Sequence, residues 1–141
     1  MRMTLALRGM LDTILQQVIS DDTKIHLIKT PFTPTEDAVI ADFDEADYTG
    51  YAAQTILPAG TIAWDDAALN AVQSFASAHF QPTASTVTNT IYGYYVTGTV
   101  KAPTLDQLID VFAFDVPVPL LGTADALDIV YEMKIGMPEL V

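Results

Sequence analysis

The sequence predicts a mainly β protein, an antiparallel β-sandwich or barrel-like module of about six strands preceded by an N-terminal amphipathic helix. Short segments rich in β-branched and aromatic residues are separated by turn residues, and no strand-helix alternation follows the first segment. The 141 residues fit one domain, so we expect a single unit over 1–141, with the helix at 3–19 and the β-sandwich at 24–136.

The N-terminal helix is expected because apolar side chains recur at three- and four-residue steps, which places them on one side of a helix. These side chains are Leu7, Met10, Leu11, Ile14, Leu15 and Val18. Gly9 lies among them and costs up to about 1 kcal/mol relative to alanine, so the helix needs packing against another element or another protein. Only Arg2 and Arg8 are basic near it, which favours protein contacts over a membrane.

Alternating patterns and β-favouring composition predict the strands. We expect strands at 25–29, 51–56, 71–81, 91–99, 109–116 and 127–135. The segment 67–79 also suits a helix, but its alternation favours a strand. Pro31 should end the first strand and Pro117 the fifth, because proline cannot donate to a β-ladder. Gly93 indicates a bulge or a close approach of two backbones.

A long acidic connection, residues 31–50, should contain one helical turn near 41–46. Its carboxylates Asp42, Asp44 and Asp47 could converge on a hard cation such as calcium. The segment lacks the glycine and the distant glutamate of a calcium-binding loop. We therefore favour a solvated acidic loop and predict no metal.

The composition argues for protein contacts. Six Lys and Arg against eighteen Asp and Glu give a formal charge of -12, which repels nucleic-acid phosphates. There is no cysteine, so disulfides and thiolate chemistry are excluded. Hydrophobic residues make up 50% and charged residues only 17%, which predicts apolar surface covered by neighbours. No apolar run approaches the roughly 18 residues of a membrane span, and no secretion signal is evident, so we expect a soluble, unprocessed protein.

No pattern predicts catalysis or cofactor binding. The two histidines, His26 and His79, fall on predicted strands, and neither a Gly-x-Ser-x-Gly elbow nor a phosphate-binding glycine loop is present. We therefore expect no enzyme and no cofactor. An aromatic groove for carbohydrate or peptide is an alternative, but packing is the favoured role of these rings. The rings concerned are Trp64, Tyr92, Tyr94 and Tyr95.

The middle of the chain contains a series of turn and strand segments, at 27–30 (LIKT), 32–35 (FTPT), 41–46 (ADFDEA), 49–51 (TGY), 80–86 (FQPTAST) and 91–97 (IYGYYVT). With the closing alternating strand, these segments resemble small virion proteins of tailed bacteriophages over about residues 24–136. The resemblance implies a β-sandwich that is commonly oligomeric, and it brings no catalytic residues.

The expected function is that of a capsid decoration, or cement, protein located in the virion after assembly in the host cytoplasm. Its partners would be the major capsid protein or other virion proteins and further copies of the chain, with a trimer favoured. The expected assembly interface consists of Leu7, Met10, Leu11, Ile14, Phe32, Pro34, Tyr48 and Tyr51. The alternatives are a tail- or fibre-associated module that binds a receptor or glycan and, less favoured, an enzyme with an acidic site at 42–47.

Overall fold

The computed structural model describes residues 22–65, 67, 70–98 and 107–136. Within these residues the protein is mainly β with antiparallel sheets, as predicted, and it contains no α-helix. The elements are β1 (Lys24–Ile28), η1 (Ile40–Asp42), β2 (Gln54–Thr55), β3 (Ala63–Asp65), β4 (Asn70–Ser74), β5 (Ala78–Phe80), β6 (Asn89–Gly98), β7 (Gln107–Leu120), β8 (Leu127–Ile129) and β9 (Glu132–Gly136). The predicted helix at 3–19 lies outside the described residues.

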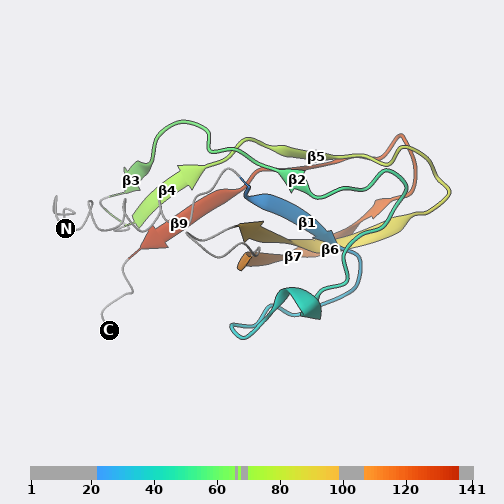
Figure 1. Ribbon diagram of the computed structural model, residues 1–141, viewed down its shortest axis with the longest axis horizontal. Helices are drawn as coiled ribbons and strands as arrows, with labels where there is room; N and C mark the ends of the chain where they lie inside the picture. Colours follow the sequence, from blue (N-terminus) through green and yellow to red (C-terminus); the bar gives the residue numbers. More distant parts are fainter. Residues whose placement is uncertain (1–21, 66, 68–69, 99–106, 137–141) are drawn as a thin grey trace.

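The described strands form three sheets (Figure 1). The four-stranded sheet has the order β2-β1-β6-β7, the three-stranded sheet has the order β3-β4-β9, and β5 pairs with β8. Side chains from all three sheets meet in one hydrophobic core. Its members include Ile25, Leu27 and Val96 from the first sheet, Ala71 and Met133 from the second, and Phe80 and Ile129 from the third.

β6 lies between β1 and β7 and is buried on both faces. Tyr94 points into the core, where its ring stacks on Phe112 with centroids 5.0 Å apart. The next residue, Tyr95, points the other way and stacks between His26 and Phe43, at 4.5 and 5.3 Å. Because successive side chains of a strand alternate between faces, the sheet needs a cover on this second face. The acidic connection supplies it.

Gly93 confirms the prediction of a bulge and a close approach. The pairing of β6 with β7 shifts register between Ile91 and Gly93. A Cβ atom at this position would collide with the backbone oxygen of Phe112 and would lie 2.7 Å from the Phe32 ring. The missing side chain thus lets β7 and the start of the connection approach the same point of β6 from two sides.

Two predicted strands are interrupted. The segment 71–81 forms β4 and β5, and 127–135 forms β8 and β9. The two segments pair up to Ser74 with Glu132 and again from Ala78 with Ile129, so three intervening residues on one side face two on the other. This unequal count breaks the ladder as a bulge does. In the closing segment the predicted alternation is confirmed, with Met133 buried and its neighbours exposed.

Other boundaries also differ from the prediction. The expected turn near 41–46 is a 3-10 turn that begins earlier, at Ile40. The strand expected at 51–56 shrinks to β2, and β3 was missing from the prediction. The expectation that Pro117 ends its strand is wrong, since β7 continues through Pro117 and Pro119. β7 is the outermost strand of its sheet, where a proline need not interrupt a ladder on the open side.

Candidate functional site

A network around Glu45 fixes the acidic connection to the four-stranded sheet. His26 Nδ1 donates to Glu45 Oε1 at 2.8 Å, and the Tyr51 hydroxyl donates to the same oxygen at 2.7 Å. The Tyr95 hydroxyl donates to Glu45 Oε2 at 3.3 Å. Burial, together with Glu45, raises the pKa of both tyrosines. The phenols therefore remain neutral donors to this carboxylate well above neutral pH.

The same network contains a hydroxyl, an imidazole and a carboxylate in series. The Thr97 hydroxyl lies 2.8 Å from His26 Nε2, and His26 Nδ1 contacts Glu45. Such a series activates a nucleophile when the hydroxyl can reach a substrate. Thr97 is only 1% exposed, so its hydroxyl has no access to a substrate in this structure. Here the series ties β1, β6 and the connection together.

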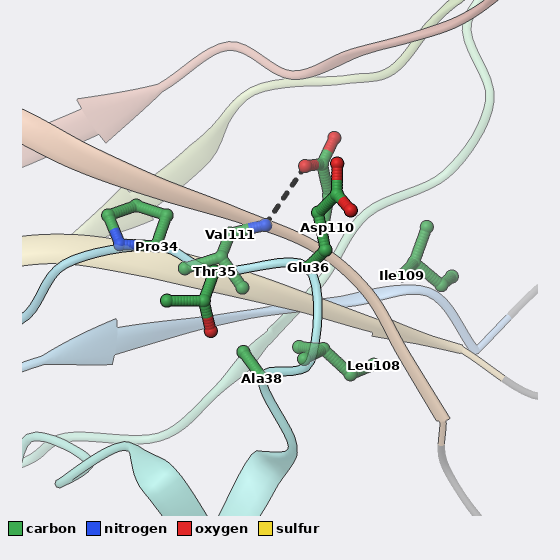
Figure 2. A pocket seen from close by; sticks show the side chains of 8 residues that line it. All are labelled: Pro34, Thr35, Glu36, Ala38, Leu108, Ile109, Asp110 and Val111. Carbon is green, nitrogen blue, oxygen red and sulfur yellow. Dashed lines mark hydrogen bonds between the residues drawn. The ribbon is translucent and has the colours of Figure 1, made fainter.

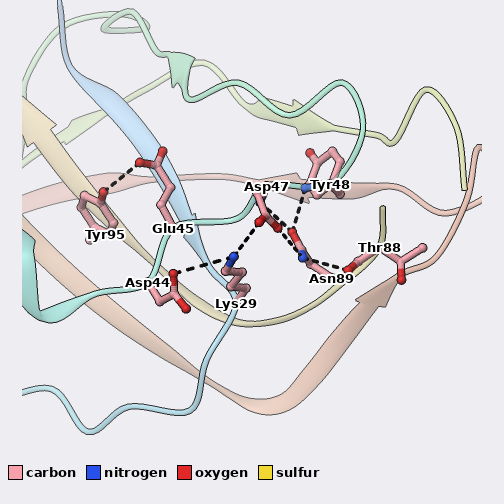
Figure 3. A network of polar contacts seen from close by, with 8 residues as sticks. All are labelled: Lys29, Asp44, Glu45, Asp47, Tyr48, Thr88, Asn89 and Tyr95. Atoms are coloured by element: carbon pink, nitrogen blue, oxygen red, sulfur yellow. Dashed lines mark hydrogen bonds and ion pairs between the residues drawn. The ribbon is translucent and has the colours of Figure 1, made fainter. Parts of the chain in front are cut away.

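A second network holds the acidic connection beside β1 (Figure 3). Lys29 Nζ contacts Asp47 Oδ2 at 2.7 Å and Asp44 Oδ1 at 3.8 Å. The Asn89 amide donates to Asp47 Oδ1 at 2.9 Å, and its oxygen accepts the Asp47 and Tyr48 N–H groups. The Lys29 ammonium, followed by Asn89, lowers the pKa of Asp47, and the pKa of Lys29 is raised in return.

The three carboxylates considered as a possible cation site bond to different protein groups. Asp44 and Asp47 share the Lys29 ammonium, while Asp42 accepts the Val39 N–H at 2.9 Å. In the described part of the chain, no group of three or more histidine, aspartate or glutamate side chains is arranged to hold a metal ion. The Lys29 ammonium group lies between Asp44 and Asp47, where a metal cation bound by both would have to lie.

The four described residues of the expected assembly interface lie in different environments. Tyr48 is 3% exposed and belongs to the core, so its ring offers no surface to another protein. Tyr51 packs against the core, and Phe32 packs edge-to-face on Phe43 with centroids 5.5 Å apart. Pro34 is exposed. Leu7, Met10, Leu11 and Ile14 lie outside the described residues.

The four aromatic residues of the alternative groove do not lie together. Tyr94 and Tyr95 lie on opposite faces of β6, and Trp64 packs against the core from β3. Tyr92 is half-buried. Tyr94 lines a hollow on the core face of β7, together with residues that the sequence patterns did not single out as a site.

His79, the other histidine, lies on the surface of β5. Its Nδ1 donates to Asp128 Oδ1 on the paired strand β8 at 2.6 Å, which raises the pKa of the imidazole. Its Nε2 lies 3.3 Å from the Gln81 side-chain oxygen. Both ring nitrogens thus face acceptors, and this arrangement stabilises the pairing of two short strands.

Several large apolar side chains remain on the surface at the β7 side of the molecule. Val116 of β7 is 75% exposed, Val130 between β8 and β9 is 71% exposed, and Phe112 of β7 is 39% exposed. Phe112 and Val130 line one hollow of about 370 Å³, the edge pocket, together with Tyr94, Asp110 and residues 131, 132 and 134. The edge pocket lies between the outermost strands of two sheets, β7 and β9.

A second hollow of about 410 Å³, the loop pocket, lies on the other face of β7 (Figure 2). It is lined by Pro34, Thr35, Glu36 and Ala38 of the connection and by residues 108–111 of β7. Asp110 belongs to both pockets, and its Oδ1 accepts the Val111 N–H at 2.9 Å. Its Oδ2 accepts the Tyr131 hydroxyl at 3.2 Å.

Sequence patterns missed this surface for an identifiable reason. Alternation in the last segment places Val130 on the same side as the exposed charges, so an apolar residue at that position was the available signal. The exposure of Phe112 depends on β7 being the outermost strand, and the order of strands in a sheet is not written in local patterns.

Comparison with protein-family models, with curated proteins and with solved structures gave no match. In the part of the chain that the structure describes, no helix is long and apolar enough to cross a bilayer.

Proposed function

We propose that this chain is a non-enzymatic structural protein of a tailed-bacteriophage virion, most simply a capsid decoration protein that stabilises the head lattice. The observation that carries the proposal is the exposure of apolar side chains on and near β7: Val116 and Val130 are each more than two thirds exposed, and Val130 lines the edge pocket with Phe112. Large exposed apolar groups of this kind mark sites of contact with other proteins. The sequence resemblance to small virion proteins supplies the setting, including the β-sandwich type of fold.

Charge supports an outer position on the particle. A chain of formal charge -12 is repelled by packaged nucleic acid and attracted to basic protein surfaces. The partners would be the major capsid protein or other virion proteins, and decoration proteins gain strength from symmetric self-association, for which we propose a trimer. Such contacts need burial of apolar area and no reactive group.

The test is binding to capsids assembled without the protein. Purified protein should bind these capsids to a fixed number of copies and raise the temperature at which they rupture. Val116→Lys should weaken the binding, because it places a charge in the apolar surface, whereas Thr61→Lys, on an exposed loop, should not. Protein that stays unbound at high concentration would contradict the proposal.

The edge pocket favours one second candidate, a tail- or fibre-associated module that binds a receptor or glycan. An exposed aromatic ring, Phe112, lies there beside the polar side chains of Asp110 and Lys134, a combination that suits sugar rings and their hydroxyls. Copy number separates the two candidates, since a decoration protein occurs in hundreds of copies per virion and a tail component in far fewer.

A further inference from the structure

We infer that the outer edge of β7 binds an extended segment of a partner protein in which basic and apolar residues alternate, and that this segment adds to the sheet as a further strand. The inference rests on the proposed function for its biological setting only. It requires three features: a strand edge that has no neighbouring strand, pockets for the alternate side chains of the added strand, and a reason why another copy of this chain does not bind there.

The edge is provided by the sheet order. β7 follows β6 and has no further strand beyond it in the described part of the chain. Phe112 and Ala113 pair with β6 on one side, and the backbone groups of this stretch that point away from β6 can form ladder bonds only with another extended chain. Pro117 and Pro119 remove two donors toward the C-terminal end, so the usable stretch lies on their N-terminal side.

The two pockets supply places for side chains on both faces of this edge. Val111 pairs with Tyr95, so it belongs to the face covered by the connection and lines the loop pocket. Phe112 stacks on Tyr94, so it belongs to the core face and lines the edge pocket. Alternate residues of a strand added beside β7 would therefore point into the loop pocket and the edge pocket in turn.

The linings predict the chemistry of the added segment. The loop pocket presents the carboxylate of Glu36 beside Asp110, and no basic side chain lines it. It suits lysine or arginine. The edge pocket combines the apolar surfaces of Tyr94, Phe112, Val130 and Tyr131 with the charged side chains of Asp110, Glu132 and Lys134, and its apolar part suits an aliphatic or aromatic residue.

Charge favours a basic segment over a second copy of β7 as the occupant. β7 contains two acids, Asp110 and Asp115, and no lysine or arginine. A second copy of β7 would bring two further acids to an edge that already presents Asp110 and Asp115, and it would offer no basic side chain to pair with them. The formal charge of -12 also attracts a basic segment.

Asp110 gives the edge its selectivity. Its carboxylate accepts the Val111 N–H, so in the free protein this backbone donor is already satisfied by a neighbouring side chain. Charges and bulges on an edge strand suppress indiscriminate pairing. A lysine or arginine of the incoming strand would meet the same carboxylate, so the group that discourages neutral strands favours a basic one.

The test uses the full chain and a short synthetic peptide of alternating lysine and valine. Binding is measured by fluorescence anisotropy, and protection of backbone amides in β7 is measured by hydrogen exchange. We expect saturable binding with protection at Ala113, because its N–H points to the same side of β7 as that of Val111. A peptide of the same composition with its lysines and valines in separate blocks should bind at least about tenfold more weakly, because its side chains cannot alternate between the pockets.

Matched variants test each pocket. Glu36→Lys should weaken peptide binding about tenfold, whereas Asp37→Lys, which makes the same charge change at an exposed residue outside the pocket, should change it by less than about threefold. Val130→Lys should weaken binding about tenfold, and Leu57→Lys, a similar change at an exposed leucine elsewhere, should change it little.

The outcomes that overturn the inference are distinct. Equal binding of a peptide methylated on alternate backbone nitrogens would show charge attraction without strand addition. No binding of any peptide, or equal effects of the pocket variants and their controls, would place the contact elsewhere. Protection of β7 by self-association in the absence of peptide would make a second copy the occupant. Failure of the peptide test leaves capsid binding unaffected, so the two proposals are tested separately.

Discussion

The substitution Tyr51→Phe tests how the connection is attached to the sheet. β2 pairs with β1 only at Lys24 and Ile25, and farther along β1 the Leu27 N–H is accepted by the Tyr51 hydroxyl at 3.1 Å. The next bond on this side comes from the Ala46 N–H to the Leu27 oxygen at 2.9 Å. One phenol thus bridges the gap between β2 and the connection on the open side of β1.

The expected loss follows from the two bonds of that hydroxyl. Leu27 is fully buried, so its N–H would be left without a partner, which costs about 1–3 kcal/mol. Glu45 loses a donor but keeps His26 and Tyr95 and is partly exposed, so water offsets part of the loss and we assign it about 1 kcal/mol. The free energy of unfolding should fall by about 2–4 kcal/mol.

Urea unfolding followed by circular dichroism measures this difference. Tyr92→Phe is the matched control, because Tyr92 is half-buried and its hydroxyl makes no hydrogen bond to any part of the described chain. It should change the free energy of unfolding by less than about 0.5 kcal/mol. If Tyr51→Phe were equally mild, the Leu27 N–H would not depend on the phenol, and the attachment described above would be wrong.

Three further predictions concern packing and pH. Gly93→Ala should destabilise the protein by about 3 kcal/mol or more, because its methyl group meets backbone on one side and a ring on the other, while Gly122→Ala should be mild in the same urea assay. Burial raises the pKa of Tyr94 and of Tyr48 to about 12. The stability that the two neutral phenols contribute is therefore complete below the unfolded pKa of about 10 and is lost as the pH rises toward 12. If the phenolate absorbance of the folded protein completed its rise near pH 10, this prediction would be contradicted. The pKa of Asp47 is lowered in the folded protein, so its ionised carboxylate contributes stability above the unfolded pKa of 3.8, and this stability is lost as the pH falls through the folded pKa. In Asp47→Asn, the urea concentration at the unfolding midpoint should therefore fall less steeply as the pH is lowered.

The sequence predicted the elements whose signals are local. β1, β6 and the alternating last segment follow from their own composition, and Gly93 was recognised because a glycine within a β-rich run indicates a bulge or a close approach. The interruptions at Ser74 and Glu132 could not be predicted, because they depend on how many residues of two distant segments face each other. Local patterns contain no such count.

The candidate surface was less predictable for a related reason. Tyr48 and Phe32 are aromatic residues of a kind common in protein interfaces. In this structure the connection folds back on the sheet, and both rings make intramolecular contacts instead: Tyr48 in the core and Phe32 on Phe43. An aromatic residue in a long loop is equally suited to an intramolecular and an intermolecular contact until the path of the loop is known. The exposed residues Val116 and Val130, in contrast, lie within strands or between them, where an apolar side chain is ordinarily assigned to the core.

Several features along β7 limit unwanted pairing of other strands with its exposed edge. Pro117 and Pro119 protect one end, and the carboxylate of Asp110 protects the other by satisfying a backbone donor. Between them, residues 114–117 bulge opposite Tyr92 and include the acid Asp115, whereas residues 111–113 pair regularly with β6 and include the exposed Phe112. An edge protected along its whole length would exclude every strand, and an unprotected edge would admit any. On the proposal made above, the short regular stretch at 111–113, with the acid Asp110 beside it, admits a basic segment of limited length.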